Sequence, residues 1–112
     1  MIISFNGYHS PLKRMWRQGK LPNVKKGLYG DILTQENLSL EHLLPVSKGG
    51  KTTMDNLVLA SKEKNSLRGN RDLKDVITRK QALDYILQFS REKSMREYMK
   101  DIFFTFRKLG VL

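Results

Sequence analysis

The stretch EHLLPVSKGGKTTMDNLVLASKEKNSLRG, residues 41–69, decides the fold that we expect for this chain. The apolar run over residues 38–44 predicts a strand that Pro45 ends, because proline cannot donate a hydrogen bond to a neighbouring strand. A flexible Ser-Lys-Gly-Gly loop follows, and residues 56–60 (NLVLA) form a second short apolar strand. The two strands are therefore expected to pair as a hairpin with a long connection.

A helix is expected directly after the second strand. Ser61 is a residue type that caps helix N-termini, and Glu63 stands in the first turn, where a carboxylate favours the positive end of the helix dipole. Gly69 is a natural stop, because helices often end on a glycine in the left-handed conformation. The centre of the chain thus predicts strand, loop, strand and helix, with the helix running from about residue 62 to 68.

Further helices are expected on both sides of this centre. Pro11 after Ser10 indicates the start of a short helix to about Gln18, preceded by a short strand within residues 2–5. In the last third, Thr78 can cap one helix, and a second helix follows Ser90. Two apolar stripes at helical spacing are expected to pack in the core: Ala82, Leu83, Ile86 and Leu87 in the first helix, and Met95, Tyr98, Met99, Ile102, Phe103, Phe106 and Leu109 in the second.

The composition is typical of a single domain that binds a polyanion. The chain has 112 residues, with 21 Lys and Arg against 11 Asp and Glu, and a formal net charge of +10. This excess attracts nucleic acid first and anionic membranes second. The absence of cysteine excludes disulfides and cysteine-ligated zinc. No apolar run approaches the roughly 20 residues of a membrane span, and the start lacks the layout of a secretory signal. We therefore expect one soluble, intracellular α+β domain over residues 1–112, in an unspecified compartment and with no membrane partner.

Glu41 and His42 place a carboxylate beside an imidazole at the end of the first strand. This pair is common by chance and means little alone. Neighbours on a regular strand point to opposite faces, so both side chains reach one reaction centre only if the strand twists or ends there. Pro45, three residues after His42, makes such an ending plausible.

Three further polar residues have both functional and ordinary interpretations. Asn65 lies in mid-helix, where asparagine has poor propensity, and its amide oxygen suits Mg²⁺ or Ca²⁺; alone, it is more often a solvent-facing residue. Arg68 lies one turn further on and could hold a phosphate, or be an ordinary surface arginine. Asn56 could bond the opposing backbone and fix the direction of His42, or simply make a turn with Asp55.

Together these residues predict a phosphodiesterase centre. A divalent ion, Mg²⁺ or Mn²⁺, held by Glu41 and Asn65 would bind a phosphate oxygen and offset charge on the leaving 3′ oxygen. Neutral His42 would take a proton from the attacking water. One centre of this kind cuts one strand at a time, so a monomer should nick duplex DNA and leave 5′-phosphate and 3′-hydroxyl ends.

The central segment, from about residue 28 to 73, resembles the HNH endonucleases. That family shows an acidic residue or His followed by His, then Asn about fourteen residues on, then Asn or His nine further. Here His42 and Asn56 are 14 residues apart, and Asn56 and Asn65 are 9 apart. The PVSKGG, DNLVLA and NSLRG segments are also similar to the family pattern. The resemblance implies a ββα-metal (His-Me finger) core, flanked by an N-terminal helix and a C-terminal helical extension from about residue 74.

The resemblance also implies a role for each motif residue. Glu41 and Asn65 would be metal ligands, His42 the general base, Asn56 the residue that orients the loop, and Arg68 a phosphate contact. The third motif residue is Asn rather than His, a variant that the family tolerates. Many relatives carry two Cys-x-x-Cys pairs for a structural zinc. The corresponding positions hold no cysteine; their occupants are Lys26, Tyr29, Ser61 and Lys64. We therefore expect no zinc here and a hairpin that is held by apolar packing.

Nucleic acid is the expected partner, DNA first and RNA second. The basic residues expected to contact it are Lys13, Arg14, Arg17, Lys48, Arg68 and Arg71. Two alternatives stay open: an RNA-cutting nuclease, and a basic binding module derived from the same fold in a nucleoprotein particle such as a ribosome. The intact Glu-His-Asn-Asn set favours an enzyme, because binding alone does not require it. The oligomeric state is not predicted, although the stripe from Met95 to Leu109 is the first place to look for a dimer surface.

Overall fold

The computed structural model describes residues 11–112, which form four helices, two strands and short 3-10 turns. The strand expected within residues 2–5 and the cap expected at Ser10 lie outside the described residues. The helices and strands, in chain order, are α1 (Pro11–Arg17), β1 (Leu38–His42), β2 (Leu57–Ser61), α2 (Lys62–Arg68), α3 (Arg79–Leu87) and α4 (Arg96–Lys108). The described chain therefore has the expected α+β composition.

The two strands pair antiparallel, in a register that runs from Leu38 opposite Ser61 to His42 opposite Leu57. β1 ends at His42, two residues before the expected end. Leu43 still bonds the main chain of Asn56, but the Asn56 side chain, rather than a strand, bonds the main chain of Leu44. The order strand, loop, strand and helix is confirmed.

The helix boundaries follow the capping residues that the sequence indicated. The Ser61 hydroxyl accepts a hydrogen bond from the Lys64 main-chain N–H at 3.2 Å, which caps α2. Gly69 ends that helix with a φ of 60°. Thr78 and Gln81 exchange hydrogen bonds between side chain and main chain at the start of α3, which makes a complete capping box.

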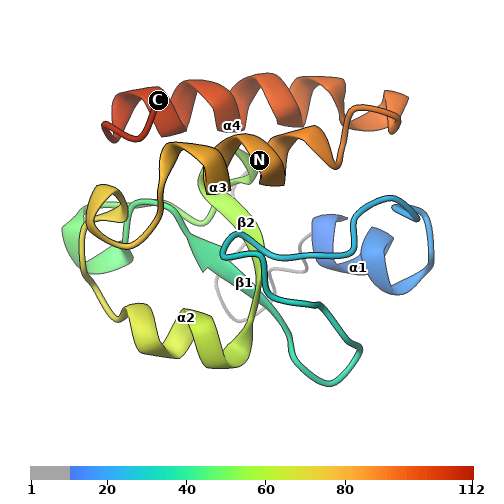
Figure 1. Ribbon diagram of the computed structural model, residues 1–112, viewed down its shortest axis with the longest axis horizontal. Helices are drawn as coiled ribbons and strands as arrows, with labels where there is room; N and C mark the ends of the chain where they lie inside the picture. The colour runs from blue at the N-terminus through green and yellow to red at the C-terminus, as the bar shows by residue number, and fades with distance from the viewer. Residues whose placement is uncertain (1–10) are drawn as a thin grey trace.

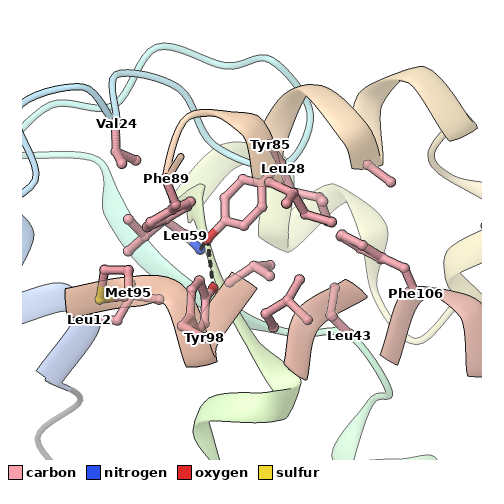
Figure 2. Close-up of a cluster of buried hydrophobic side chains, with 14 of the residues drawn as sticks. Leu12, Val24, Leu28, Leu43, Leu59, Tyr85, Phe89, Met95, Tyr98 and Phe106 are labelled. Carbon is pink, nitrogen blue, oxygen red and sulfur yellow. Dashed lines mark hydrogen bonds between the residues drawn. The ribbon is translucent and has the colours of Figure 1, made fainter. Parts of the chain in front are cut away.

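The outer edge of β2 is buried and bonded by groups from outside the sheet. A two-stranded sheet leaves main-chain groups unpaired on its outer edges. The Leu28 N–H donates to the Leu59 carbonyl at 2.9 Å, and the Leu59 N–H donates to the Tyr85 hydroxyl at 3.0 Å. The Tyr98 hydroxyl donates to the Leu57 carbonyl at 2.7 Å. It also bonds the Tyr85 hydroxyl at 2.8 Å (Figure 2). These bonds allow a small hairpin to sit inside the core.

The apolar core lies between the hairpin and the two C-terminal helices. α3 and α4 lie on one side of the hairpin and α2 on the other (Figure 1). The core includes tightly packed aromatic rings, with the Phe89 ring 5.3 Å from that of Tyr85 and 5.1 Å from that of Tyr98, between centroids. None of the helices within residues 11–112 is long and apolar enough to cross a membrane.

Three residues of the expected apolar stripes lie outside the core: Leu83, which is half-buried, Leu87 and Phe103. Leu87 is 61% exposed and Phe103 is 37% exposed. Phe103 follows the buried Ile102 directly, which turns it about 100° around the helix and away from the core. On α3, Tyr85 is buried although the expected stripe did not include it. The helical period was therefore correct, but the width assigned to each buried stripe was too large.

Candidate active site

Glu41 lies one residue before the end of β1 and is 1% exposed. Its Oε2 atom accepts hydrogen bonds from the Tyr29 hydroxyl and from Arg68 Nη1, the latter at 2.8 Å. Its Oε1 atom is buried and has no hydrogen-bond partner among the described residues. Burial raises the pKa of the Glu41 carboxyl, and the hydrogen bonds from Tyr29 and Arg68 act against that rise. The carboxylate is thus fixed through one oxygen only.

Arg68 is 3% exposed and holds the end of β1. Besides Glu41, its guanidinium donates to the carbonyl oxygens of His42 and Leu43, both at 2.7 Å, and of Arg71 at 3.0 Å. The sequence predicted an accessible arginine that contacts phosphate. The structure instead buries this guanidinium, because the carbonyls at the end of β1 and the Glu41 carboxylate supply the acceptors that it needs.

His42 is the last residue of β1, and its side chain is half-buried. Its Nε2 atom lies 2.9 Å from the Thr52 hydroxyl, which belongs to the long loop between the strands. Burial, and then the positive charge of Arg68, lower the pKa of the His42 imidazole. Both effects favour the neutral ring, which is the form that can accept a proton.

Asn56 closes the loop that carries Thr52. Its Oδ1 atom accepts from the Leu44 N–H at 2.8 Å, and its Nδ2 atom donates to the carbonyls of Leu44 and Lys51 at 3.0 and 2.9 Å. Gly50 lies against the same carbonyl of Leu44, and a Cβ atom there would overlap it. Asn56 is therefore bonded to the main chain next to the end of β1, as the sequence led us to expect.

Asn65 extends from α2 to the middle of β1. Its Nδ2 atom donates to the Ser39 hydroxyl at 3.0 Å and to the Leu40 carbonyl at 2.9 Å. Ser39 and Glu41 alternate with Leu40 and so share one face of β1. The Oδ1 atom of Asn65 has no hydrogen bond to the described residues, which leaves a hard oxygen ligand available. Within residues 11–112 no group of three or more His, Cys, Asp or Glu side chains could hold a metal ion.

A comparison with protein families identifies this segment. Residues 28–72 match the family model for the HNH endonuclease. This segment belongs to the HNH endonuclease family. The match includes Glu41, His42, Asn56, Asn65 and Arg68, and it indicates a nuclease-type function on nucleic acid. Neither the curated proteins nor the solved structures that were compared with the chain gave a match.

The turn that opens the HNH segment is joined to the start of α2 by the carboxylate of Asp31. This carboxylate accepts hydrogen bonds from the main-chain N–H groups of Tyr29, at 3.1 Å, and of Ser61, at 2.5 Å. Gly27 has no side chain because a Cβ atom would meet this carboxylate and the Ala60 backbone. Apolar packing alone was expected to hold the hairpin here, so the expectation was incomplete. The chain also uses the half-buried Asp31 carboxylate to join two of the positions where cysteines were considered, Tyr29 and Ser61.

The predicted basic contacts of the HNH segment and α1 differ in their surroundings. Arg14 and Arg17 are exposed. Burial lowers the pKa of Lys13, and the positive charges of Arg17 and Lys62 lower it further. Lys62 begins α2, so the basic cluster of α1 continues onto the helix that carries Asn65. By contrast, Lys48 is paired with Asp72 at 2.6 Å. Arg71, an exposed residue, donates to the main-chain carbonyls of Leu67 and Arg68.

Tyr29, Thr52 and Lys62 are the residues at this site that the sequence analysis missed. Tyr29 was considered only as the occupant of a cysteine position, and its contact with Glu41 spans 12 residues of an irregular segment. Thr52 carries no signal beyond its place in a polar loop. Lys62 was hidden by its role at a helix start. Only the folded chain brings these residues to the motif.

Proposed function

We propose that this chain is a metal-dependent HNH endonuclease that hydrolyses phosphodiester bonds in DNA. One observation carries the proposal: the motif side chains are held through some of their polar atoms, while other atoms suited to the reaction have no partner among residues 11–112. Glu41 is held through Oε2 and Asn65 through Nδ2. This leaves Oε1 of Glu41 and Oδ1 of Asn65 as acceptors where α2 lies against β1, a place that we call the β1–α2 junction.

Two oxygen atoms of different kinds are suited to a divalent ion. Within the described part of the chain, the buried Oε1 atom of Glu41 lacks the partner that a buried carboxylate oxygen normally has. The Oδ1 atom of Asn65 is a neutral hard ligand, and Mg²⁺ and Mn²⁺ prefer such oxygens. When bound, such an ion supplies Lewis-acid chemistry at the phosphate and offsets the charge that grows on the leaving 3′ oxygen. We expect weak affinity without substrate, because the described residues supply two ligands in this arrangement.

His42 is the proposed general base. The proposal requires the tautomer in which Nε2–H donates to the Thr52 hydroxyl, because Nδ1 can then accept a proton from water. The oxygen of that water forms the new bond to phosphorus, and the bond from phosphorus to the 3′ oxygen breaks. The products carry a 5′ phosphate and a 3′ hydroxyl. The lowered pKa of His42 keeps the ring neutral and ready for this step.

Arg68 and Asn56 have positioning roles in this proposal. Arg68 binds Glu41 and the His42 carbonyl together, so one guanidinium sets the spacing between the carboxylate and the base. Asn56 fixes Leu44 and the loop that brings Thr52 to His42. The phosphate contacts are assigned instead to the cations of α1 with Lys62, and to Lys48 and Arg71 at the other end of α2.

A binding module is the second candidate, and one observation favours it. Arg68 already compensates the charge of Glu41, and this buried ion pair would compete with a metal ion for the carboxylate. In that case the chain would bind nucleic acid and leave it intact. The unpaired Oε1 atom favours the enzyme, because an ion pair alone gives no reason to leave a buried oxygen unsatisfied.

A cleavage assay distinguishes the two candidates. Supercoiled plasmid and a labelled RNA are incubated with the purified chain in Mg²⁺, in Mn²⁺ or in EDTA, and binding is measured in the same buffers. We expect cleavage of DNA with either metal and none in EDTA. The Asn65→Ala variant should need more metal for the same rate. Binding without cleavage in either metal would support the binding module, and cleavage of RNA alone would reassign the substrate.

A further inference from the structure

The side of α4 that faces away from the core combines two phenyl rings with three cations. The buried residues Tyr98, Ile102 and Phe106 mark the inner side of this helix. The opposite side of α4 is exposed, and it also carries Glu97, Asp101 and Lys108. Five of its residues form one strip at helical spacing, and we refer to them as the α4 outer face: Arg96, Lys100, Phe103, Phe104 and Arg107.

The two rings of the α4 outer face are unusually accessible for such large apolar side chains. Phe103 is 37% exposed and Phe104 is 56% exposed, and their centroids are 6.2 Å apart at an interplanar angle of 73°. Neighbouring exposed rings of this kind mark interaction sites more often than isolated ones do. Neither ring belongs to the core, because the inner side of α4 supplies the apolar packing of this helix.

The three cations of the α4 outer face are not neutralised within the described chain. None of them forms an ion pair with a described carboxylate, whereas Arg68, Lys48 and Lys80 all do. Glu97 and Asp101 are also exposed and border Phe104 on one side, while Arg96, Lys100 and Arg107 form a row on its other side. The row therefore presents positive charge between the two rings.

We propose that the α4 outer face binds single-stranded nucleic acid, with unpaired bases stacked on the two rings and phosphates held by the three cations. Base stacking on exposed aromatic side chains beside cations is the physical basis of sequence-tolerant binding to single strands. A second copy of the chain fits poorly, because two such faces would bring their cations together. α4 lies on the opposite side of the hairpin from α2 (Figure 1), so a surface on the outer side of α4 is separate from the proposed active site.

The test compares two strands that differ only in their bases. A fluorescent twelve-nucleotide DNA strand and an abasic strand with the same number of phosphates are titrated with the full chain in EDTA, which keeps binding independent of the proposed cleavage. We expect the chain to prefer the base-bearing strand by about 5- to 100-fold. The Phe103→Ala/Phe104→Ala variant should lose that preference. Lys100→Ala/Arg107→Ala should weaken binding to both strands by similar factors.

Two further variants keep the test decisive. Phe104→Leu retains apolar bulk without the ring and should reduce the preference even if the double variant folds poorly. Ile32→Ala removes another apolar side chain, one that is 70% exposed, and should leave the preference intact. An equal affinity of the unaltered chain for both strands, or a full preference in the phenylalanine variants, would overturn the proposal. So would self-association of the chain that the phenylalanine substitutions abolish without any change in strand binding.

Discussion

Arg68 and Arg107 are the same side chain in opposite settings. Arg68 is 3% exposed, and its guanidinium bonds Glu41 and three main-chain carbonyls at the β1–α2 junction. Arg107 is exposed on α4 and forms no ion pair with the described residues. The first arginine shapes a site from within, and the second is available to an external anion. A count of positive charges cannot separate these two roles, because burial and partners decide them.

The same comparison separates structural stability from binding. A buried ion pair is weak evidence of net stabilisation, because desolvation of both charges opposes their attraction. Removal of one partner is nevertheless costly, since it leaves the other charge buried and unpaired. An exposed cation without a partner carries no such penalty. Substitutions at the junction should therefore act on folding, and substitutions on the α4 outer face should act on binding.

The largest expected effect on folding is that of Arg68→Ala. The change leaves the Glu41 carboxylate buried without its positively charged partner, and we expect the free energy of unfolding to fall by about 3–5 kcal/mol. The matched change Arg107→Ala, at an exposed position, should alter it by no more than about 0.5 kcal/mol. Urea denaturation of both variants measures the difference. Equal losses would remove the distinction between the two arginines.

Asn56→Ala should come next. The change leaves the N–H and carbonyl of Leu44 and the carbonyl of Lys51 without their partner, and we expect a loss of about 2–4 kcal/mol. Asn56→Asp keeps the acceptor but removes both donors, so it should not restore the stability. Asn70→Ala, at an exposed position, is the control and should change the midpoint little. A stable Asn56→Ala protein would show that the loop does not depend on this amide.

A smaller effect is expected for Tyr29→Phe. This change removes one hydroxyl that donates to the Glu41 carboxylate and keeps the ring, at a half-buried position. We expect a loss of about 1–2 kcal/mol, at the lower end of values for hydrogen bonds to charged groups. In a Glu41→Gln background the same change should cost less, because the charged acceptor has already been removed. An identical loss in both backgrounds would mean that Tyr29 acts through packing rather than through Glu41.

The α1 cations should change salt dependence rather than folding. In Lys13→Ala/Arg14→Ala/Arg17→Ala, binding to duplex DNA should weaken for all sequences alike, because phosphate contacts carry no base information. The slope of log affinity against log salt should become shallower by about one unit for each lost contact. The Lys80→Ala variant, which alters an exposed cation on α3 that is paired with Asp84, is the control. A loss confined to one DNA sequence would contradict a backbone role for α1.

The parts of the fold that sequence predicted correctly depend on short-range signals. Ser61, Gly69 and Thr78 act within one helical turn, so their capping roles are visible without knowledge of the rest of the chain. The spacing from His42 to Asn56 and Asn65 likewise identified the segment that matches the HNH endonuclease family. The end of the first strand was predicted two residues too late, because the Asn56 side chain, rather than a paired strand, bonds the main chain of Leu44.

The parts that sequence could not predict depend on contacts between distant residues. Arg68 meets Glu41 across 27 residues, and an arginine in an exposed-looking helix gives no sign of burial. Tyr29 and Asp31 act through an irregular turn, where no periodicity guides an expectation. Phe103 was placed in the core because a stripe at helical spacing does not reveal how wide the buried side of a helix will be.

Cleavage of supercoiled plasmid by the His42→Ala variant tests the central claim most directly. The unaltered chain and the variant are compared at low enzyme concentration in Mg²⁺, with DNA binding and thermal unfolding measured on the same samples. We predict that open-circle DNA accumulates before linear DNA with the unaltered chain, and that His42→Ala nicks on the order of 10²–10⁴-fold more slowly while it still binds DNA. Undiminished nicking by folded His42→Ala protein would contradict the assignment of His42 as the base and, with it, the proposed mechanism.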